Sequence, residues 1–325
     1  MPDRITKFLH SRYAALPAGA LMIAAAWSTH VDGSTPLQVD EGGIALPPAF
    51  TWLSDADVST WAAIACNVAI MAALIILNNR YNLLRSMTML AAVFFAAMQC
   101  ATPHLTARFY TGPLLALVLL GCIGLMFGSY AQPWKRRLVF LVFFLLSAGA
   151  ATQYAYAVYI PLMLVGCWQM RIMSPRTALA AAIGLVTPWW ILLGLGIVSP
   201  ADIRVPEPVK LLSYIDFSQG VHLGTTMVVA AVVFIAAIVL DFFRTIAYNA
   251  RSRSYNGMIV LTGFFTILAI AIDYNNVACY VPLMNACAAL QAAQFFVIHR
   301  SGRSWMGIAG LLTVYLSLYI WAIVD

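Results

Sequence analysis

The sequence predicts an all-α protein, a polytopic bundle of transmembrane helices. Of its 325 residues, 62% are hydrophobic and only 9% are charged, whereas a soluble domain carries about 25% charged residues. A water-soluble chain of this composition would lack the polar surface to cover itself. Apolar runs of about 20 residues recur along the chain, and this length matches a hydrocarbon core about 30 Å thick. The runs do not alternate polar and apolar residues, as the strands of a membrane barrel would.

The apolar runs follow one another without a soluble domain between them, so we expect residues 1–325 to form a single integral membrane domain. The two larger loops, 31–56 and 199–222, are expected on the outer side. The runs fall at about 14–30, 57–78, 87–101, 113–130, 138–170, 177–198, 223–241, 256–272, 278–298 and 305–324.

The run 138–170 is either one long helix or a hairpin of two short helices. Lysine and arginine near membrane spans prefer the cytoplasmic side. With a hairpin and a cytoplasmic N-terminus, all eighteen cations face the cytoplasm except Arg108, Arg204 and Lys210. With one long helix, seven other cations between Arg171 and Arg303 would lie outside, and only Arg204 and Lys210 would move inside. The charge pattern therefore predicts the hairpin, about eleven spans, a cytoplasmic N-terminus and an outer C-terminus.

The net charge of +6 and the pI of about 9.1 follow from this topology, because the cations are concentrated in the inner loops. Nucleic acid is therefore not an expected partner. The six cysteines all lie in apolar stretches without C-x-x-C spacing, so we interpret them as packing residues. The sequence indicates no particular cofactor, and no local histidine spacing predicts a metal site.

An acid pair, Asp40 and Glu41, follows the first span in the stretch PLQVDEGGIALPPAF. A carboxylate at a membrane surface can act as a general base and take a proton from an attacking hydroxyl. The alternative is that the pair only solvates a loop. A first helix followed by an outer loop with an early acid pair is similar to the start of the C-type (GT-C) membrane glycosyltransferases. That resemblance implies that Asp40 or Glu41 is the base and that the donor sugar is carried on a polyprenyl phosphate.

A phosphate-bearing substrate needs cations on the outer face, and the predicted topology leaves few there. Arg108 lies in PHLTARFY, and Arg204 and Lys210 lie in DIRVPEPVKLL. His104 is near Arg108 at the end of a span. We therefore expect Arg108, Arg204, Lys210 and His104 to be the candidate substrate-binding residues.

A second resemblance covers roughly residues 77–190. The segments LNNRYNLLRSMTML, TPHLTARFYTGPLLALVLL, KRRLVFLVFFLLSAGAATQYAYAVYIPLML and AAIGLVTPWW resemble an uncharacterised family of bacterial polytopic membrane proteins. The resemblance implies a location in the bacterial inner membrane.

Two functions remain open at this point. One is a non-catalytic integral-membrane subunit of a cell-envelope assembly or transport complex, with other membrane proteins as partners. The other is a GT-C-like glycosyltransferase or polysaccharide polymerase that uses a polyprenyl-phosphate-linked glycan. Because the sequence contains no strong catalytic motif, it favours the subunit. Membrane lipids are expected partners in both cases.

The first prediction concerns topology. Reporter fusions placed after Arg137 and after Arg176 should both report a cytoplasmic location, because the hairpin returns the chain to the side from which it started. If the two fusions report opposite sides, the hairpin is wrong.

Overall fold

The computed structural model describes residues 11, 13–31, 44–203, 217–246, 248–299 and 304–324. All regular elements within these ranges are helical, which confirms the all-α fold class. The α-helices are α2 (Ala15–Val31), α3 (Ala56–Tyr81), α4 (Leu90–Cys100), α5 (Pro103–Thr106), α6 (Thr111–Gly128), α7 (Arg136–Thr152), α8 (Ala155–Val158), α9 (Ile160–Gln169), α10 (Pro175–Gly194), α11 (Phe217–Ile246), α12 (Ala250–Ile272), α13 (Val277–Ile298) and α14 (Ser304–Val324), and the short 3-10 helices are η1 (Ala49–Thr51), η2 (Pro200–Asp202) and η3 (Tyr274–Asn276).

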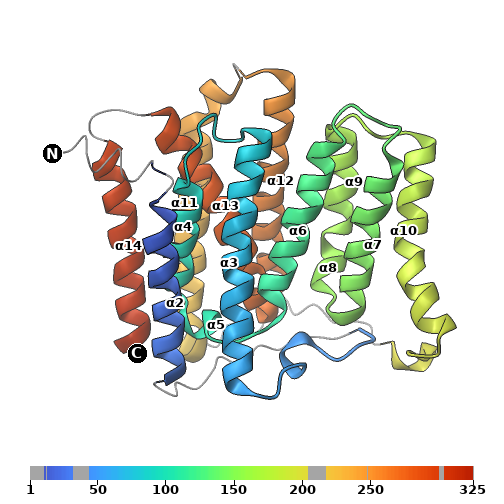
Figure 1. The fold of residues 1–325 in the computed structure, drawn as a ribbon, viewed down its shortest axis with the longest axis horizontal. Helices are drawn as coiled ribbons and strands as arrows, with labels where there is room; N and C mark the ends of the chain where they lie inside the picture. The colour runs from blue at the N-terminus through green and yellow to red at the C-terminus, as the bar shows by residue number, and fades with distance from the viewer. Residues whose placement is uncertain are drawn as a thin grey trace.

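Seven of the described helices are long and apolar enough to cross a membrane: α3, α6, α10, α11, α12, α13 and α14. They stand side by side in one bundle, and the shorter helices α2, α4, α7 and α9 lie among them with similar direction (Figure 1). Apolar helices are suited to a bilayer because they satisfy their backbone hydrogen bonds internally. The architecture is thus that of a helical membrane protein.

The apolar run 138–170 contains two main helical segments joined by a break. α7 ends at Thr152, and Gln153 adopts extended backbone before α8 and α9 begin. A side chain at Gly149 would overlap the ring of Tyr156, so the tight return of the chain requires glycine there. The orphan carbonyl of Ala151 at the end of α7 accepts the backbone N–H groups of Ala45 and Leu46 at 3.0 and 2.9 Å. Residues 45 and 46, which precede η1, are therefore anchored to the end of α7.

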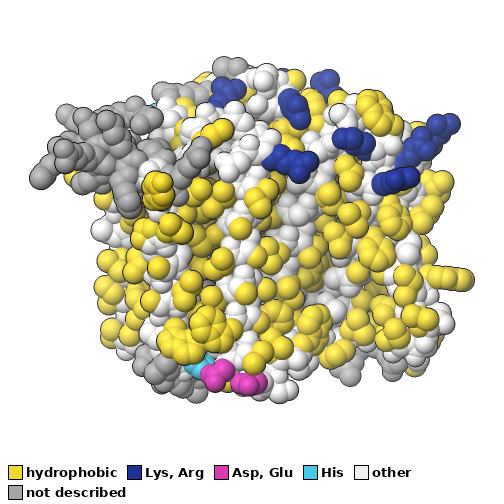
Figure 2. Space-filling view, viewed as in Figure 1, with side chains coloured by type: hydrophobic (Ala, Val, Ile, Leu, Met, Phe, Trp, Pro, Cys, Tyr) yellow, Lys and Arg dark blue, Asp and Glu magenta, His cyan; other side chains and the backbone are white. Residues whose placement is uncertain are grey.

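The two ends of the bundle differ in charge. Figure 2 shows lysine and arginine side chains gathered at the end where α3 finishes and α7 and α10 begin. The acidic side chains visible in the same view lie at the opposite end, where α3 begins. We call these the cation-rich end and the cation-poor end.

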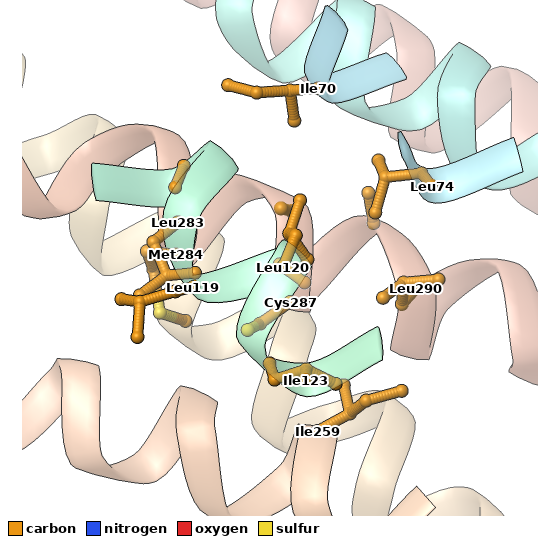
Figure 3. Close-up of a cluster of buried hydrophobic side chains, with 14 of the residues drawn as sticks. Ile70, Leu74, Leu119, Leu120, Ile123, Ile259, Leu283, Met284, Cys287 and Leu290 are labelled. Carbon is orange, nitrogen blue, oxygen red and sulfur yellow. The ribbon is translucent and has the colours of Figure 1, made fainter. Parts of the chain in front are cut away.

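α13 forms the centre of the bundle. Every side chain from Val277 to Gln294 is buried, and α13 packs against α4, α6, α11 and α12. A helix that is apolar on all sides belongs in a core, and the many alanines of α13 let neighbouring helices approach closely. Figure 3 shows Leu283, Met284 and Cys287 of α13 among side chains of α3, α6 and α12. None of the six cysteines forms a disulfide.

A chain of buried amides crosses this core. The Gln99 side-chain N–H₂ donates to Asn67 Oδ1 at 2.7 Å, and the Asn285 side-chain N–H₂ donates to Gln99 Oε1 at 2.8 Å. All three side chains are at most 2% exposed. The chain therefore joins α3, α4 and α13 by directional bonds inside an apolar core. Gln291 of α13 makes a comparable bond to Asn256 of α12 at 2.9 Å.

The second prediction follows from this chain. Gln99→Leu should lower the free energy of unfolding by about 1–3 kcal/mol, because hydrogen bonds inside membrane proteins contribute about 0.6–1.7 kcal/mol each and the change removes two. The measurement is reversible unfolding of purified protein in mixed micelles. Gln294→Leu is the matched control, because the buried Gln294 side-chain nitrogen has no hydrogen-bond partner. Equal losses in the two variants would contradict the role of the chain.

Candidate functional site

A pocket with a volume of about 400 Å³ opens at the cation-poor end of the bundle. Its walls come from the last turn of α2, the segment around η1, the first turns of α3, and the short α5 with the residues that follow it. We call it the Arg108 pocket. The lining residues are Thr29, His30, Phe50, Leu53, Ser54, Ala56, Ser59, Thr60, His104, Ala107 and Arg108.

α3 holds the backbone on both sides of Arg108. The Thr60 hydroxyl lies 2.8 Å from the carbonyl oxygen of Ala107, and the backbone N–H of Phe109 donates to Ser59 Oγ at 3.1 Å. Ser59 and Thr60 are adjacent residues in the first turns of α3, and both are buried. α3 itself starts in a defined place because Asp55 caps it by accepting the backbone N–H of Asp57 at 3.0 Å. The position of Arg108 is therefore fixed by a long helix.

The Arg108 side chain is half-buried in the pocket wall. Its guanidinium carbon lies 5.7 Å from the ring centroid of Phe50, a cation–π distance. Among the described residues, no carboxylate forms a salt bridge with it. The guanidinium therefore keeps donors available for a ligand, and its planar fork suits phosphate and carboxylate oxygens.

His104 lies in the same pocket, with one ring nitrogen engaged. Its Nε2 lies 3.2 Å from the carbonyl oxygen of Ala322 in α14. A carbonyl only accepts, so Nε2 carries the hydrogen. The other nitrogen, Nδ1, is buried without a hydrogen-bond partner. A buried polar atom without a partner is costly, and a ligand atom in the pocket could supply the missing bond.

His30 is held by two side chains of α3. Its Nε2 lies 2.8 Å from Asp57 Oδ1, and its Nδ1 lies 3.0 Å from Thr60 Oγ1. Thr60 in turn reaches the carbonyl of Ala107, the residue before Arg108. A chain of polar contacts within hydrogen-bonding distance thus leads from the exposed Asp57 to the backbone that carries Arg108. We call this path the His30 relay.

Three tryptophans surround this region. Trp27 lies 5.2 Å from Trp61 and 5.4 Å from His30, measured between ring centroids. Trp52 lies 6.5 Å from Phe109. All three tryptophans are partly exposed. Tryptophan is enriched where hydrocarbon meets lipid headgroups, so this group of tryptophans is typical of a region near the membrane surface.

The structure brings two of the sequence-predicted site residues together, Arg108 and His104. The other four candidates, Asp40, Glu41, Arg204 and Lys210, lie outside the described residues. Another histidine, His222 in the second turn of α11, lies outside the pocket lining and contacts the Leu318 carbonyl at 3.0 Å. Sequence reasoning missed the role of Thr60, because a threonine inside an apolar helix gives no distinguishing signal.

A second polar cluster, at Asp273, connects the α7–α8 break to the turn between α12 and α13. The hydroxyls of Tyr154 and Tyr280 donate to Asp273 Oδ2 at 2.6 and 3.0 Å, and the Asn276 side-chain N–H₂ donates to Asp273 Oδ1 at 3.2 Å. The Asp273 side chain is buried. Burying a carboxylate is costly unless it is hydrogen-bonded, and here three donors meet that need. We interpret this cluster as a structural connection.

Metal-binding geometry is not found in the part of the chain that the structure describes, where no three His, Cys, Asp or Glu side chains group together. Comparison of the chain with protein-family models, with curated proteins and with solved structures finds no match. The function is therefore argued from the geometry of the Arg108 pocket.

The third prediction tests the Asp273 cluster. Tyr154→Phe and Tyr280→Phe should each lower the free energy of unfolding by about 1.5–3 kcal/mol, the usual contribution of a hydrogen bond to a charged group. Tyr315→Phe is the control, because the buried Tyr315 hydroxyl has no partner and its removal should cost little. Denaturation of the purified variants in micelles gives the comparison. A loss at Tyr315 as large as that at Tyr154 would refute the assignment.

Proposed function

We propose that the protein binds the phosphate-bearing headgroup of a lipid-linked substrate in the Arg108 pocket. One observation supports this most strongly. At the end of the bundle that is poor in cations, α3 fixes an arginine in a pocket beside a histidine with an unpartnered nitrogen. An arginine fork is suited to phosphate oxygens, and the unpartnered His104 nitrogen can accept a hydrogen bond from a sugar hydroxyl of the same headgroup.

The proposed setting is the plasma membrane of a bacterium, with the cation-rich end in the cytoplasm. The charge difference between the two ends supports this orientation through the preference of lysine and arginine for the inner side. In this orientation the chain crosses the membrane about eleven times. The short segments α2, α4, α7 and α8–α9 would add four crossings to those of the seven long helices. The Arg108 pocket then faces the outer leaflet.

The size of the pocket supports a headgroup larger than a bare phosphate. Small-molecule sites usually have volumes of about 300–1,000 Å³, and the Arg108 pocket has about 400 Å³. A phosphate and one sugar fit such a volume. The hydrocarbon tail of the substrate would remain in the bilayer beside the tryptophans. A polyprenyl-phosphate-linked glycan meets these requirements, and it is the donor that the resemblance of the first-loop sequence to C-type glycosyltransferases implies.

Catalysis is a separate step of the proposal. If the protein transfers a sugar, Asp40 or Glu41 would remove the proton from the acceptor hydroxyl. Asp40→Asn or Glu41→Gln would then reduce turnover by about 10²- to 10⁴-fold. If both variants retain full activity in a complementation assay, the protein binds its lipid without using these acids as a base.

The fourth prediction tests binding itself. Arg108→Ala should weaken the binding of a long-chain polyprenyl phosphate at least about tenfold, because a hydrogen bond to a charged group contributes about 1.5–3 kcal/mol and about 1.4 kcal/mol is tenfold. Arg108→Lys should retain part of the affinity, since it keeps the charge but not the fork. Arg137→Ala is the control, because Arg137 is an exposed cation at the first turn of α7, at the other end of the bundle.

The assay is direct titration of protein in lipid nanodiscs, with the uncharged polyprenol as the second ligand. The proposal requires that the phosphate binds more tightly than the alcohol and that Arg108→Ala removes the difference. Equal binding of the two lipids, unchanged by Arg108→Ala, would reject a headgroup site. The non-catalytic subunit of an envelope complex would then be the function to pursue.

A further inference from the structure

The His30 relay contains more acceptors than hydrogens, and this determines how it can respond to protons. The single hydrogen of the Thr60 hydroxyl has three possible acceptors within reach. They are His30 Nδ1 at 3.0 Å, the Ala107 carbonyl at 2.8 Å and the Ala56 carbonyl at 2.9 Å. A hydroxyl donates only one hydrogen bond, so the charge state of His30 decides which acceptor receives it.

In a neutral His30, one ring nitrogen donates and the other accepts. Asp57 can only accept when it is ionised, so Nε2 carries the hydrogen and donates to Asp57 Oδ1. Nδ1 then accepts from the Thr60 hydroxyl. In this state Thr60 has no hydrogen left for the Ala107 carbonyl.

In a protonated His30, both ring nitrogens are donors. Nδ1 now donates to Thr60 Oγ1, and the Thr60 hydrogen turns toward a carbonyl. The Ala56 carbonyl already accepts a backbone N–H of α3 in the regular helical pattern. The Thr60 hydroxyl is therefore expected to donate its hydrogen bond to the Ala107 carbonyl. Protonation therefore strengthens the hold of α3 on the residue that precedes Arg108.

Among the described residues, four titratable or charged side chains lie near His30. Asp57 and Asp55 lie on or before the first turn of α3, and Arg108 and His104 line the same pocket from the α5 side. The Trp27 ring of α2 lies 5.4 Å from the His30 ring, measured between centroids, and can stabilise a protonated His30 by a cation–π interaction. Asp57 balances part of an added positive charge, because it contacts the ring directly. The net result of protonation is one more positive charge beside the Arg108 pocket.

We propose that His30 is a positioning residue that makes anion binding in the Arg108 pocket proton-dependent. Protonated His30 adds a positive charge and, through Thr60, secures the backbone of Arg108. Neutral His30 removes both effects. Histidine is the side chain whose charge changes most readily between about pH 5 and pH 8. Binding of an anionic headgroup should therefore strengthen as the pH falls through this range. This inference rests on the proposed headgroup site.

The test measures affinity at about pH 6 and about pH 8 in nanodiscs. The probe is a polyprenyl phosphodiester, because a phosphate monoester would itself titrate near pH 6. The wild type should bind the diester about three- to tenfold more tightly at the lower pH, as one added charge near the ligand contributes about 1 kcal/mol in a wet site. His30→Gln should remove this gain, since an amide keeps hydrogen-bonding capacity but does not titrate.

Two further variants make the result specific. His222→Gln is the control for histidine loss at the same end, because His222 lies outside the pocket lining, and its pH dependence should match that of the wild type. His104→Gln should retain a gain on acidification. If the gain disappears in His104→Gln and persists in His30→Gln, the assignment to His30 is overturned.

The outcomes separate this inference from the function on which it rests. Binding that depends on Arg108 but has the same affinity at both pH values overturns the role of His30 and leaves the headgroup site intact. Failure of the wild type to bind the diester at either pH, together with no preference for polyprenyl phosphate over polyprenol, overturns both.

Discussion

The structure depends on one constraint, that polar groups inside an apolar bundle must find partners within the protein. The amide chain Asn67–Gln99–Asn285 meets this constraint at the centre, where α13 is buried on every side. Apolar packing alone does not determine how helices register against each other in lipid, because the lipid tails are equally apolar. Directional amide bonds do determine it. They set α3 and α4 against α13, and α2, α6, α11 and α12 each pack against at least one of these three helices.

The same helix that carries Asn67 also builds the pocket. Thr60 lies two turns before Asn67 on α3, a distance of about 10 Å along the axis. Because α3 is held in the core by Asn67, the positions of Ser59 and Thr60 at its start are determined too, and these residues hold the backbone around Arg108. The pocket is therefore an extension of the core toward the bundle end. Its walls join segments that are up to about eighty residues apart in the sequence, from Thr29 to Arg108.

The sequence predicted the helical membrane class, because composition and the length of apolar runs can be read without knowing which residues contact each other in the fold. It also proposed Arg108 and His104 as candidate binding residues, since few cations fall in the loops predicted to lie outside, and their role stays a prediction. It could not predict the His30 relay, because His30, Thr60 and Ala107 come from three separate elements and no local pattern marks their approach. Asp273 is a comparable case. The structure buries its side chain, and one of the donors that the carboxylate needs comes from Tyr154, in a distant part of the chain. The number of crossings and the orientation stay predictions based on charge.

The most direct measurement for the central claim is a high-resolution cryo-electron microscopy structure in nanodiscs that contain a polyprenyl phosphate. Our account predicts density for the phosphate in the Arg108 pocket, within hydrogen-bonding distance of the Arg108 guanidinium, with the prenyl chain extending into the bilayer beside Trp27 and Trp61. Phosphate density at another place on the protein, or a pocket filled by an ordinary acyl chain in the presence of saturating ligand, would contradict it.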